Sequence, residues 1–345
     1  MKPVIAITPG DPSGIGAEVT LKALAQETFY DQCIPLVVGD GAVLRDAISF
    51  TGSPLRLRPV SEPEEARGRF GTVDLLDQRL LSAGDWTYGR VGRASGEAAF
   101  QYIVRAIGLA NARRVDAVVT GPINKEAIHL AGHPFSGHTE IFAHYTHTTD
   151  YAMLLISGNL RVIHCTTHVS MRQACDMITE KRVGVTIRLA QRAMEAMGMP
   201  GGTIGVAGLN AHCSENGLFG TEEADAIIPA IERARAEGLR VEGPVPPDTV
   251  FVKALAGQYD IVVAMYHDQG HIPLKLHGFR MDPATGLFSS VSGVNTTIGL
   301  PIIRTSVDHG TAFDRAGRNV SNAESMEEAL ALAVRMALHR EGTTA

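Results

Sequence analysis

The sequence predicts an α/β protein with mostly parallel sheets. Short apolar runs alternate along the chain with longer amphipathic runs, and most of the short runs are continuously apolar, as strands buried on both faces are. With 345 residues, the chain is long enough for two domains and a sizeable core. No internal repeat or low-complexity tract interrupts the alternation.

The predicted strands and helices follow from these runs. Short segments rich in Val, Ile and Leu are predicted as strands, at residues 3–8, 34–39, 116–121, 151–157, 161–167, 202–209, 260–266 and 300–306. Longer segments with helical spacing of apolar residues are predicted as helices, at residues 96–113, 179–197, 221–238 and 326–340. Pro and Gly near residues 51–72 and 280–293 favour flexible connections there.

Composition excludes several classes of protein. The chain is 45% hydrophobic and 20% charged, as ordinary soluble globular proteins are. Its net charge of -6 and its lack of Lys/Arg clusters with interleaved aromatic residues argue against a nucleic-acid partner. There is no apolar stretch of membrane-spanning length and no signal peptide at the start, so we expect no membrane partner and a cytoplasmic location. The cysteines form no CxxC pair and are predicted to be reduced thiols: Cys33, Cys165, Cys175 and Cys213.

Polar residues gather where the predicted strands end, which is where α/β proteins bind ligands. His168, His212 and His267 each lie within a few residues of the end of a different strand. Three neutral imidazoles with open coordination positions suit a catalytic divalent metal, zinc above all, with cobalt, nickel, manganese or magnesium as alternatives. The alternative that each imidazole only hydrogen-bonds its own loop stays open.

The stretch HDQGHIP raises a second metal hypothesis. His267 and His271 have the spacing of a zinc-protease helix. Asp268, however, stands where the protease motif has Glu. Gly270 and Pro273 further argue against a helix, so we expect none here and reject the protease.

Asp268 and Lys275 in the same stretch are candidate catalytic residues. Asp268 could bind the metal directly, or it could accept a hydrogen bond that fixes the tautomer of His267. Lys275 could carry a proton or bind an anionic group of the substrate.

Two glycine-rich segments are candidates for nucleotide binding. GDPSGIG, at residues 10–16, lacks the order of a Walker loop and of a dinucleotide fingerprint, and by itself predicts only a tight turn. TSVDHGTAFDRAGR, at residues 305–318, is a stronger candidate because its small residues let the backbone approach a flat ligand. In this segment Asp314 could accept hydrogen bonds from ribose hydroxyls, and His309 could lie against an adenine.

Several blocks of the sequence together resemble the 4-hydroxythreonine-4-phosphate dehydrogenase family. They are GDPSGIG, TGPINKEAI, SGHTE, TTHVSMR, GLNAH, AMYHDQGHIPLK and GVNTTIGLPIIRTSVDHGTAFDRAG, and they run from residue 10 to 317. The first and last blocks are also similar to those of isocitrate and isopropylmalate dehydrogenases. The resemblance implies two α/β/α domains with a cleft between them. One is a nucleotide-binding domain of residues 1–128 and 266–345, and the other is a metal-binding and dimerisation domain of residues 129–265.

The resemblance also implies site residues and partners. The metal would be shared between the two subunits of a homodimer and bound by His168, His212 and His267. A small anionic substrate would be bound by His138, Thr139, Lys275, Asn295 and Arg304, with Asp248 near the site. NAD, or NADP, would be bound by Gly10, Asp11, Gly14, His309, Gly310 and Asp314.

Some of these residues have other interpretations. His138 and Thr139 could cap a helix that begins there, although a helix N-terminus also suits a phosphate. Lys125 could be solvated on a helix surface, although its place just after a predicted strand also suits a ligand site. Arg304 could instead form a buried ion pair, with Asp308 or Asp314.

The family resemblance implies that the enzyme oxidises the secondary alcohol of a phosphorylated hydroxy acid, such as 4-phosphohydroxy-L-threonine, and that the resulting β-keto acid loses carbon dioxide. Biosynthetic members usually have GLNPHAGE in place of GLNAHCSE, lack the insertion at residues 280–292, and carry an apolar residue in place of His271. HDQGHIPLK is instead similar to paralogues that oxidise 4-phospho-D-threonate, 4-phospho-D-erythronate or the cis-dihydrodiol of terephthalate. The alternative of another class is a non-catalytic protein that binds anions or nucleotides.

Overall fold

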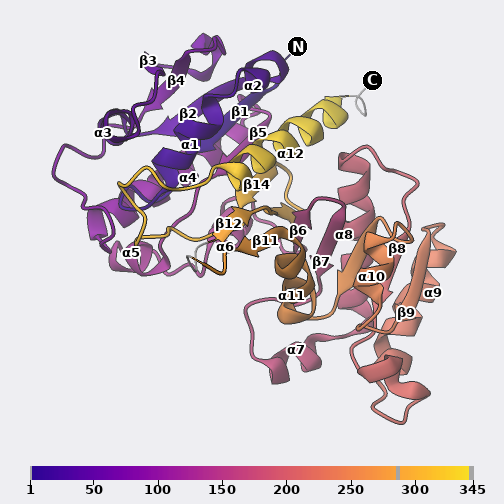
Figure 1. The fold of residues 1–345 in the computed structure, drawn as a ribbon. Helices are drawn as coiled ribbons and strands as arrows, with labels where there is room; N and C mark the ends of the chain where they lie inside the picture. Colours follow the sequence, from indigo (N-terminus) through magenta and orange to yellow (C-terminus); the bar gives the residue numbers. More distant parts are fainter. Residues whose placement is uncertain (1, 285–287, 342–345) are drawn as a thin grey trace. The chain divides into compact units, whose positions relative to one another are not determined.

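The computed structural model describes residues 2–284 and 288–341, and Figure 1 shows its ribbon. Contacts divide the chain into two compact units: Met1–Thr148 with Leu300–Ala345 form unit 1, and Thr149–Gly299 form unit 2. Each unit contains neighbouring strands with helices packed on them. The predicted α/β class with mostly parallel strands is confirmed.

The strands of unit 1 lie in the order β3-β4-β2-β1-β5-β14, and all neighbours are parallel. Their bounds are Val4–Thr8 (β1), Ile34–Gly39 (β2), Arg56–Val60 (β3), Thr72–Asp77 (β4), Ala117–Thr120 (β5) and Ile303–Val307 (β14). The helices are Gly16–Leu24 (α1), Glu27–Gln32 (α2), Gly41–Thr51 (α3), Arg93–Asn111 (α4), Lys125–Leu130 (α5), His138–Tyr145 (α6) and Glu324–Glu341 (α12), with a short 3-10 turn at Pro63–Glu65.

Helices pack on both faces of the unit 1 strands. On one face, Ala6 and Val118 pack with Ile107 of α4 in the buried core. Successive strand residues point to opposite faces. Thr305, the neighbour of Val119 in the register, therefore faces α12, where its hydroxyl donates to Ala329 O at 2.8 Å.

The strands of unit 2 lie in the order β13-β6-β7-β10-β8-β9. β7, β10, β8 and β9 are parallel, whereas β6 is antiparallel to both of its neighbours. The strand bounds are Ala152–Ser157 (β6), Leu160–His164 (β7), Ile204–Ala207 (β8), Val241–Val245 (β9), Ile261–Ala264 (β10) and Val294–Ile298 (β13). The helices are Met171–Met177 (α7), Glu180–Ala196 (α8), Ile228–Ala236 (α9), Val250–Leu255 (α10) and His267–Gly278 (α11), with a 3-10 turn at Ala211–Glu215 (η2) and a π-helical turn at Glu223–Ile227 (η3).

All the predicted strands form, and the structure adds strands that the sequence did not predict. β3 and β9 each lie at an end of the strand order and carry Pro59 and Pro244. Proline is tolerated in such edge strands because one side of the strand needs no ladder hydrogen bonds. The prediction of flexible connections was therefore wrong for β3 in 51–72. It was also wrong for β11 (Phe279–Met281) and β12 (Phe288–Val291), which pair as a hairpin.

The prediction that no helix forms around Gly270 and Pro273 is wrong, because α11 spans both. A Cβ on Gly270 would lie 2.3 Å from His164 Nε2, so the glycine lets α11 pack directly against β7. Leu274, one turn further on, is fully buried in the core of unit 2. Tertiary packing of this face thus outweighs the unfavourable helix propensity of Gly and Pro.

The division into units differs from the predicted domain boundaries. α6 lies in unit 1, because Ile141 and Phe142 pack into its core. α11 lies in unit 2, because it packs on β6 and β7. Residues 129–148 therefore lie in unit 1 and residues 266–299 in unit 2, each in the other domain from the one predicted.

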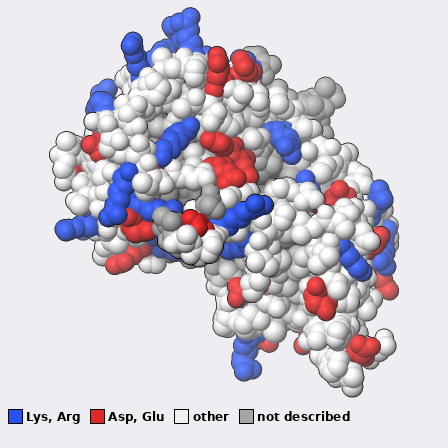
Figure 2. Space-filling model, viewed as in Figure 1, with Lys and Arg blue, Asp and Glu red and all other residues white. Residues whose placement is uncertain are grey.

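Charges of both signs are interspersed on the face of the molecule shown in Figure 2. Because the net charge is -6, any anion that binds would have to be attracted by particular cationic side chains. Among residues 2–284 and 288–341, no helix is both long and apolar enough to cross a bilayer.

Candidate active site

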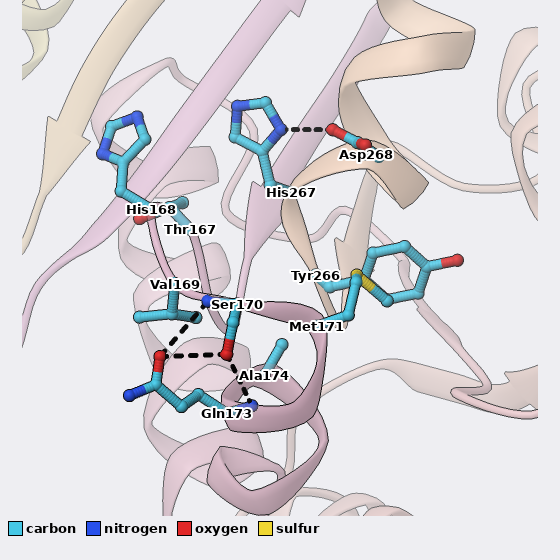
Figure 3. Close-up of a pocket in the computed structure, with 10 residues that line it drawn as sticks. All are labelled: Thr167, His168, Val169, Ser170, Met171, Gln173, Ala174, Tyr266, His267 and Asp268. Atoms are coloured by element: carbon cyan, nitrogen blue, oxygen red, sulfur yellow. Dashed lines mark hydrogen bonds and ion pairs between the residues drawn. The ribbon is translucent and has the colours of Figure 1, made fainter.

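His168 and His267 lie together at one edge of unit 2 (Figure 3). β7 and β10 are parallel neighbours, and their pairing continues past the strands, where Cys165 N–H donates to Ala264 O at 2.8 Å. His168 follows β7, and His267 opens α11 just after β10. The two imidazole ring centres are consequently only 5.8 Å apart.

The backbone next to His168 is fixed by a capped helix. Ser170 is the N-cap of α7, and its hydroxyl accepts from Gln173 N–H at 3.3 Å, while the Gln173 side chain accepts from Ser170 N–H at 3.3 Å. Figure 3 shows this reciprocal capping box beside the two imidazoles. The pocket that these segments line has a volume of about 470 Å³.

The carboxylate of Asp268 fixes the tautomer of His267. His267 Nδ1 and Asp268 Oδ1 are 2.6 Å apart. Because a carboxylate oxygen only accepts, the proton sits on Nδ1 and the Nε2 lone pair is left for another ligand. This is the arrangement that metal-binding histidines commonly have.

Two further histidines lie behind His267. The ring of His271 stacks on that of His267, with centres 3.5 Å apart and an interplanar angle of 14°, and its Nδ1–H donates to His267 O at 2.9 Å. The ring centre of His164 lies 4.8 Å from that of His271. Burial, with the nearby His267, lowers the pKa of His271 to about 4, and burial with the nearby His271 lowers that of His164 to about 3. Both are therefore neutral at pH 7.

His212 does not join His168 and His267 within one chain. It lies in the exposed turn η2 after β8 and does not line their pocket. In the part of the chain that the structure describes, no three His, Cys, Asp or Glu side chains are arranged to hold one metal ion. The structure thus brings together two of the three predicted metal ligands.

The remaining predicted residues of unit 2 lie in different elements. Asp248 is exposed just before α10. Burial raises the pKa of Cys213, and the charge of Asp248 raises it slightly further, so Asp248 lies near the turn that carries His212. Lys275 lies eight residues after His267 in α11, about 12 Å along the helix axis. Its Nζ is 4.4 Å from the centre of the Phe279 ring. Asn295 is half-buried in β13.

In unit 1, Arg304 is a buried cation. It is 2% exposed in β14, and its Nη2 donates to Thr120 Oγ1 at 3.1 Å. Its guanidinium carbon lies 5.6 Å from the centre of the Phe142 ring. Burial lowers the pKa of Arg304 to about 9, whereas the charge of Glu140 raises it. A buried guanidinium is suited to bidentate binding of a phosphate or carboxylate.

His138 and Thr139 open α6 near Arg304. The N-cap of α6 is Gly137, and no side chain caps the helix, so the capping interpretation of the two residues does not hold. Burial lowers the pKa of His138, and the charge of Arg304 lowers it further. Within the described residues, the buried His138 Nε2 has no hydrogen-bond partner. A helix N-terminus with a neutral imidazole beside a guanidinium is suited to an anion.

Lys125 lies beside this helix N-terminus. It is exposed as the first residue of α5, as the solvation interpretation expects. Its Cε is nevertheless only 3.9 Å from the position that a Cβ on Gly137 would take. Its side chain therefore runs along the start of α6.

The two glycine-rich segments also lie side by side in unit 1. Ile15 N–H donates to Thr311 O at 3.1 Å, and a Cβ on Gly14 would lie 3.0 Å from Thr311. Gly10 has a φ of 81°, and a Cβ there would lie 2.1 Å from Pro122 O, so no other residue fits. These predicted nucleotide segments therefore lie in contact, with residues 10–16 buried.

Asp11 of the first glycine-rich segment and Asp314 of the second differ in exposure. Asp11 is 1% exposed, accepts from Ser13 N–H at 2.8 Å, and has its pKa raised by burial to about 6. It shapes the turn from within. Asp314 is 80% exposed, next to the half-buried His309 and the exposed Gly310, and is accessible to a ligand.

Residues 31–333 match the model of the family described as pyridoxal phosphate biosynthetic protein PdxA. The chain belongs to the PdxA family. This confirms the predicted family, and members of it among the relatives are dehydrogenases, so the chain is an oxidoreductase of the dehydrogenase class.

Three relatives show how far the similarity extends. D-threonate 4-phosphate dehydrogenase of Cupriavidus necator is 47% identical over 339 residues, covering 98% of each chain. The crystal structure of 4-hydroxythreonine-4-phosphate dehydrogenase from Klebsiella pneumoniae is 45% identical, with a TM-score of 0.85 over 98% of each chain. Terephthalate 1,2-cis-dihydrodiol dehydrogenase from Burkholderia xenovorans is 31% identical, with a TM-score of 0.67 over 97% of this chain and 98% of that one. The similarity to these three relatives therefore covers 97–98% of the chain.

Sequence reasoning overlooked two residues that organise this PdxA-family site. Gln269 donates from Nε2 to Gly208 O at 2.8 Å and accepts from Met265 N–H at 2.6 Å, so it ties the end of β8 to the end of β10. Glu223 is a buried carboxylate that binds the turn carrying His212. Gln269 lies inside the conspicuous HDQGH stretch, but nothing in the local sequence distinguishes Glu223 from its neighbour Glu222.

Proposed function

We propose that this PdxA-family enzyme is a divalent-metal- and NAD(P)-dependent dehydrogenase. It oxidises the secondary alcohol of a 4-phosphorylated hydroxy acid, and the β-keto acid product then loses carbon dioxide. The observation that carries the proposal is the pair of imidazoles of His168 and His267, 5.8 Å apart, with His267 oriented by Asp268.

The residues present fit a zinc-type metal. Two imidazoles that bind one ion at Zn–N distances of about 2.0–2.1 Å have ring centres roughly 5–6 Å apart, which is the spacing found. His168 and His267 would hold the metal together with His212. Because His212 lies apart from the other two within one chain, we propose a homodimer in which a second copy completes the set. Zinc is the first choice, and cobalt, nickel, manganese and magnesium are the alternatives.

The chain's own residues support the two chemical steps. A bound divalent metal would acidify the substrate hydroxyl and polarise the carbonyl of the keto acid, and a bound nicotinamide would accept the hydride. Asp268 keeps the proton of His267 on Nδ1, so that Nε2 stays available. Lys275 Nζ lies over the Phe279 ring in this structure. Once its side chain rotates away from that ring, it would accept the hydroxyl proton.

Unit 1 supplies candidate binding groups for the phosphate and the nucleotide. Arg304, with His138 and Thr139 at the start of α6, would bind the phosphate, because an anion there compensates a buried guanidinium. The nucleotide would lie beside the two glycine-rich segments, against the accessible His309, Gly310 and Asp314, with the buried Gly10 and Gly14 letting the backbone behind them pack closely. Asp11 would act by holding the turn. Asn295 and Asp248 would contribute to the substrate site.

Among the possible substrates, we favour 4-phospho-D-threonate. Two observations support it: the 47% identity to D-threonate 4-phosphate dehydrogenase of Cupriavidus necator, and the imidazole of His271 stacked on His267 where biosynthetic members carry an apolar residue. The alternatives are 4-phospho-D-erythronate, 4-phosphohydroxy-L-threonine and the cis-dihydrodiol of terephthalate.

An activity panel tests the proposal. The four compounds are incubated with NAD or NADP, and the absorbance of the reduced nicotinamide is followed. We expect turnover to be highest with 4-phospho-D-threonate, to be abolished by a chelator, and to return with zinc or cobalt. Ligand-induced stabilisation without turnover of any compound would instead indicate the non-catalytic alternative.

A further inference from the structure

The turn that carries His212 has an unusual backbone. The five consecutive residues 212–216 all have positive φ, at 52°, 55°, 66°, 46° and 57°, and none of them is glycine. L-amino acids avoid this left-handed conformation because Cβ approaches the following carbonyl oxygen. Such a run persists only where surrounding contacts impose it. The contacts that impose it here therefore determine where the His212 imidazole lies.

One buried carboxylate, that of Glu223, makes those contacts. Glu223 is 2% exposed at the start of η3. Its Oε1 accepts the backbone N–H groups of Leu209 and Asn210, each at 2.8 Å. Its Oε2 accepts from Asn210 Nδ2 at 2.9 Å and from the Ser214 hydroxyl. The carboxylate thus holds residues on both sides of His212.

Gly208 packs closely against the turn and against the carboxylate of Glu223. A Cβ on Gly208 would lie 2.8 Å from Cys213 Sγ and 3.1 Å from Glu223 Oε1. The carbonyl of Gly208 is itself held by the side chain of Gln269 in α11, at 2.8 Å. The base of the turn is thereby tied to the helix that His267 opens.

The neighbouring Glu222 provides an internal comparison. Its carboxylate is half-buried and, among residues 2–284 and 288–341, accepts one hydrogen bond, from Asn210 Nδ2 at 2.7 Å. Among the described residues, the Leu209 N–H and the Ser214 hydroxyl donate to Glu223 and not to Glu222. The two adjacent glutamates therefore have the same side chain, but Glu223 accepts four hydrogen bonds from the turn and its base, whereas Glu222 accepts one.

We propose that Glu223 is a positioning residue that fixes the left-handed turn of residues 212–216 and so aims the His212 imidazole at the metal. This inference rests on the proposed function, in which His212 is a metal ligand. Because the turn occupies both oxygens of its carboxylate, Glu223 would act through His212 and not by binding the metal or the substrate. Its carboxylate accepts four hydrogen bonds from residues 209, 210 and 214, and without them the turn would lose its anchor.

The test compares Glu223→Gln with the matched variant Glu222→Gln and with His212→Ala. Glu223→Gln keeps the size of the side chain, but it turns an NH₂ group toward the Asn210 amide. Two readouts are taken on the full-length protein: hydrogen exchange of the backbone amides of residues 209–216 without metal, and zinc affinity by competition with a chelator. We expect Glu223→Gln to speed exchange of these amides at least about tenfold and to weaken zinc binding roughly 10- to 100-fold, as loss of a group that orients a ligand does. Glu222→Gln should remain close to the parent in both.

The outcomes separate this inference from the proposed function. Parent-like exchange and zinc affinity in Glu223→Gln would overturn the inference. So would faster exchange without loss of zinc affinity, if His212→Ala does lose it. If His212→Ala keeps parent affinity, the metal set of the proposed function is wrong, while the exchange data still decide whether Glu223 holds the turn. Should Glu223→Gln fail to fold, Ser214→Ala removes one of the four donors and should show a smaller loss in the same direction.

Discussion

The Asp268 carboxylate lies 2.6 Å from Nδ1 of His267, on the side of the ring away from the free Nε2 lone pair. The two residues are adjacent in the chain at the first turn of α11, so the contact needs no distant element. It keeps His267 in the tautomer that a metal requires. Metal affinity is therefore expected to depend on a residue that need not touch the metal.

Replacing Asp268 by Asn should weaken metal binding. The amide is a poorer acceptor for the Nδ1 proton of His267, so we expect zinc affinity to fall roughly 10- to 100-fold. Chelator competition on the purified protein measures this. Asp176→Asn, at an exposed position of α7, is the control and should bind zinc like the parent. An equal zinc affinity of both variants would contradict a role of Asp268 in orienting His267 for the metal.

Replacing Gly270 by Ala should destabilise unit 2. The new Cβ would lie 2.3 Å from His164 Nε2, so α11 has to shift away from β7, at a cost of about 1–3 kcal/mol. Gly108→Ala is the matched control, because Gly108 is also inside a helix but has open space around it. It should raise stability by about 1 kcal/mol. Urea unfolding of both variants checks the opposite signs, and a stable Gly270→Ala would contradict the packing.

Stability should fall as the pH is lowered through the range where buried histidines titrate. Burial, with the nearby His271, lowers the pKa of His164 from its ordinary value of 6.5 to about 3 in the folded protein, so the unfolded chain binds more protons between these values. The contribution is complete above about pH 6.5 and is lost progressively as the pH falls toward 3. His164→Asn keeps a donor for Met153 O but does not titrate. Its unfolding free energy should therefore fall less steeply over this range, and equal slopes would refute the assignment.

Replacing Arg304 by Lys should impair phosphate recognition. A lysine loses the fork that binds two phosphate oxygens, and the loss of a charge-assisted hydrogen bond corresponds to a KM about 10- to 100-fold higher for the phosphorylated substrate. Inorganic phosphate should also stabilise this variant less than the parent in thermal unfolding. Arg105→Lys, on the exposed side of α4, is the control. If both variants keep the parent KM, the phosphate binds elsewhere.

The sequence predicted those parts of the fold that depend on continuous burial. β1, β5 and β10 are apolar runs, apart from the threonine that ends β1 and β5, so burial on both faces was visible in the sequence. β3 and β9 contain Pro and charged residues that only an edge position tolerates, and edge position is a tertiary property. α11 was missed for the same reason, because the close fit of Gly270 against His164 is not local in sequence.

The candidate site shows the same limit. His168 and His267 could be brought together from the sequence, because they follow strands that proved to be parallel neighbours. The family resemblance implied a metal shared between two subunits, but the residues themselves did not predict that His212 lies apart from the other two within one chain, nor that it sits in a left-handed turn after β8. The contacts that hold this turn come from outside it: Glu223 reaches back 13 residues to Asn210, and Gln269 reaches back 61 residues to Gly208.

Mixing two inactive variants tests the central claim most directly, namely that imidazoles from two copies of the chain complete one metal site. His212→Ala and His267→Ala are each expected to lack activity. In a symmetric dimer, a mixture that exchanges subunits should regain about a quarter of the parent activity, because half of the dimers are mixed and one of their two sites is intact. A mixture of His168→Ala and His267→Ala should stay inactive, because these two imidazoles lie together in one chain. No recovery in the first mixture, with subunit exchange verified, would contradict the shared site.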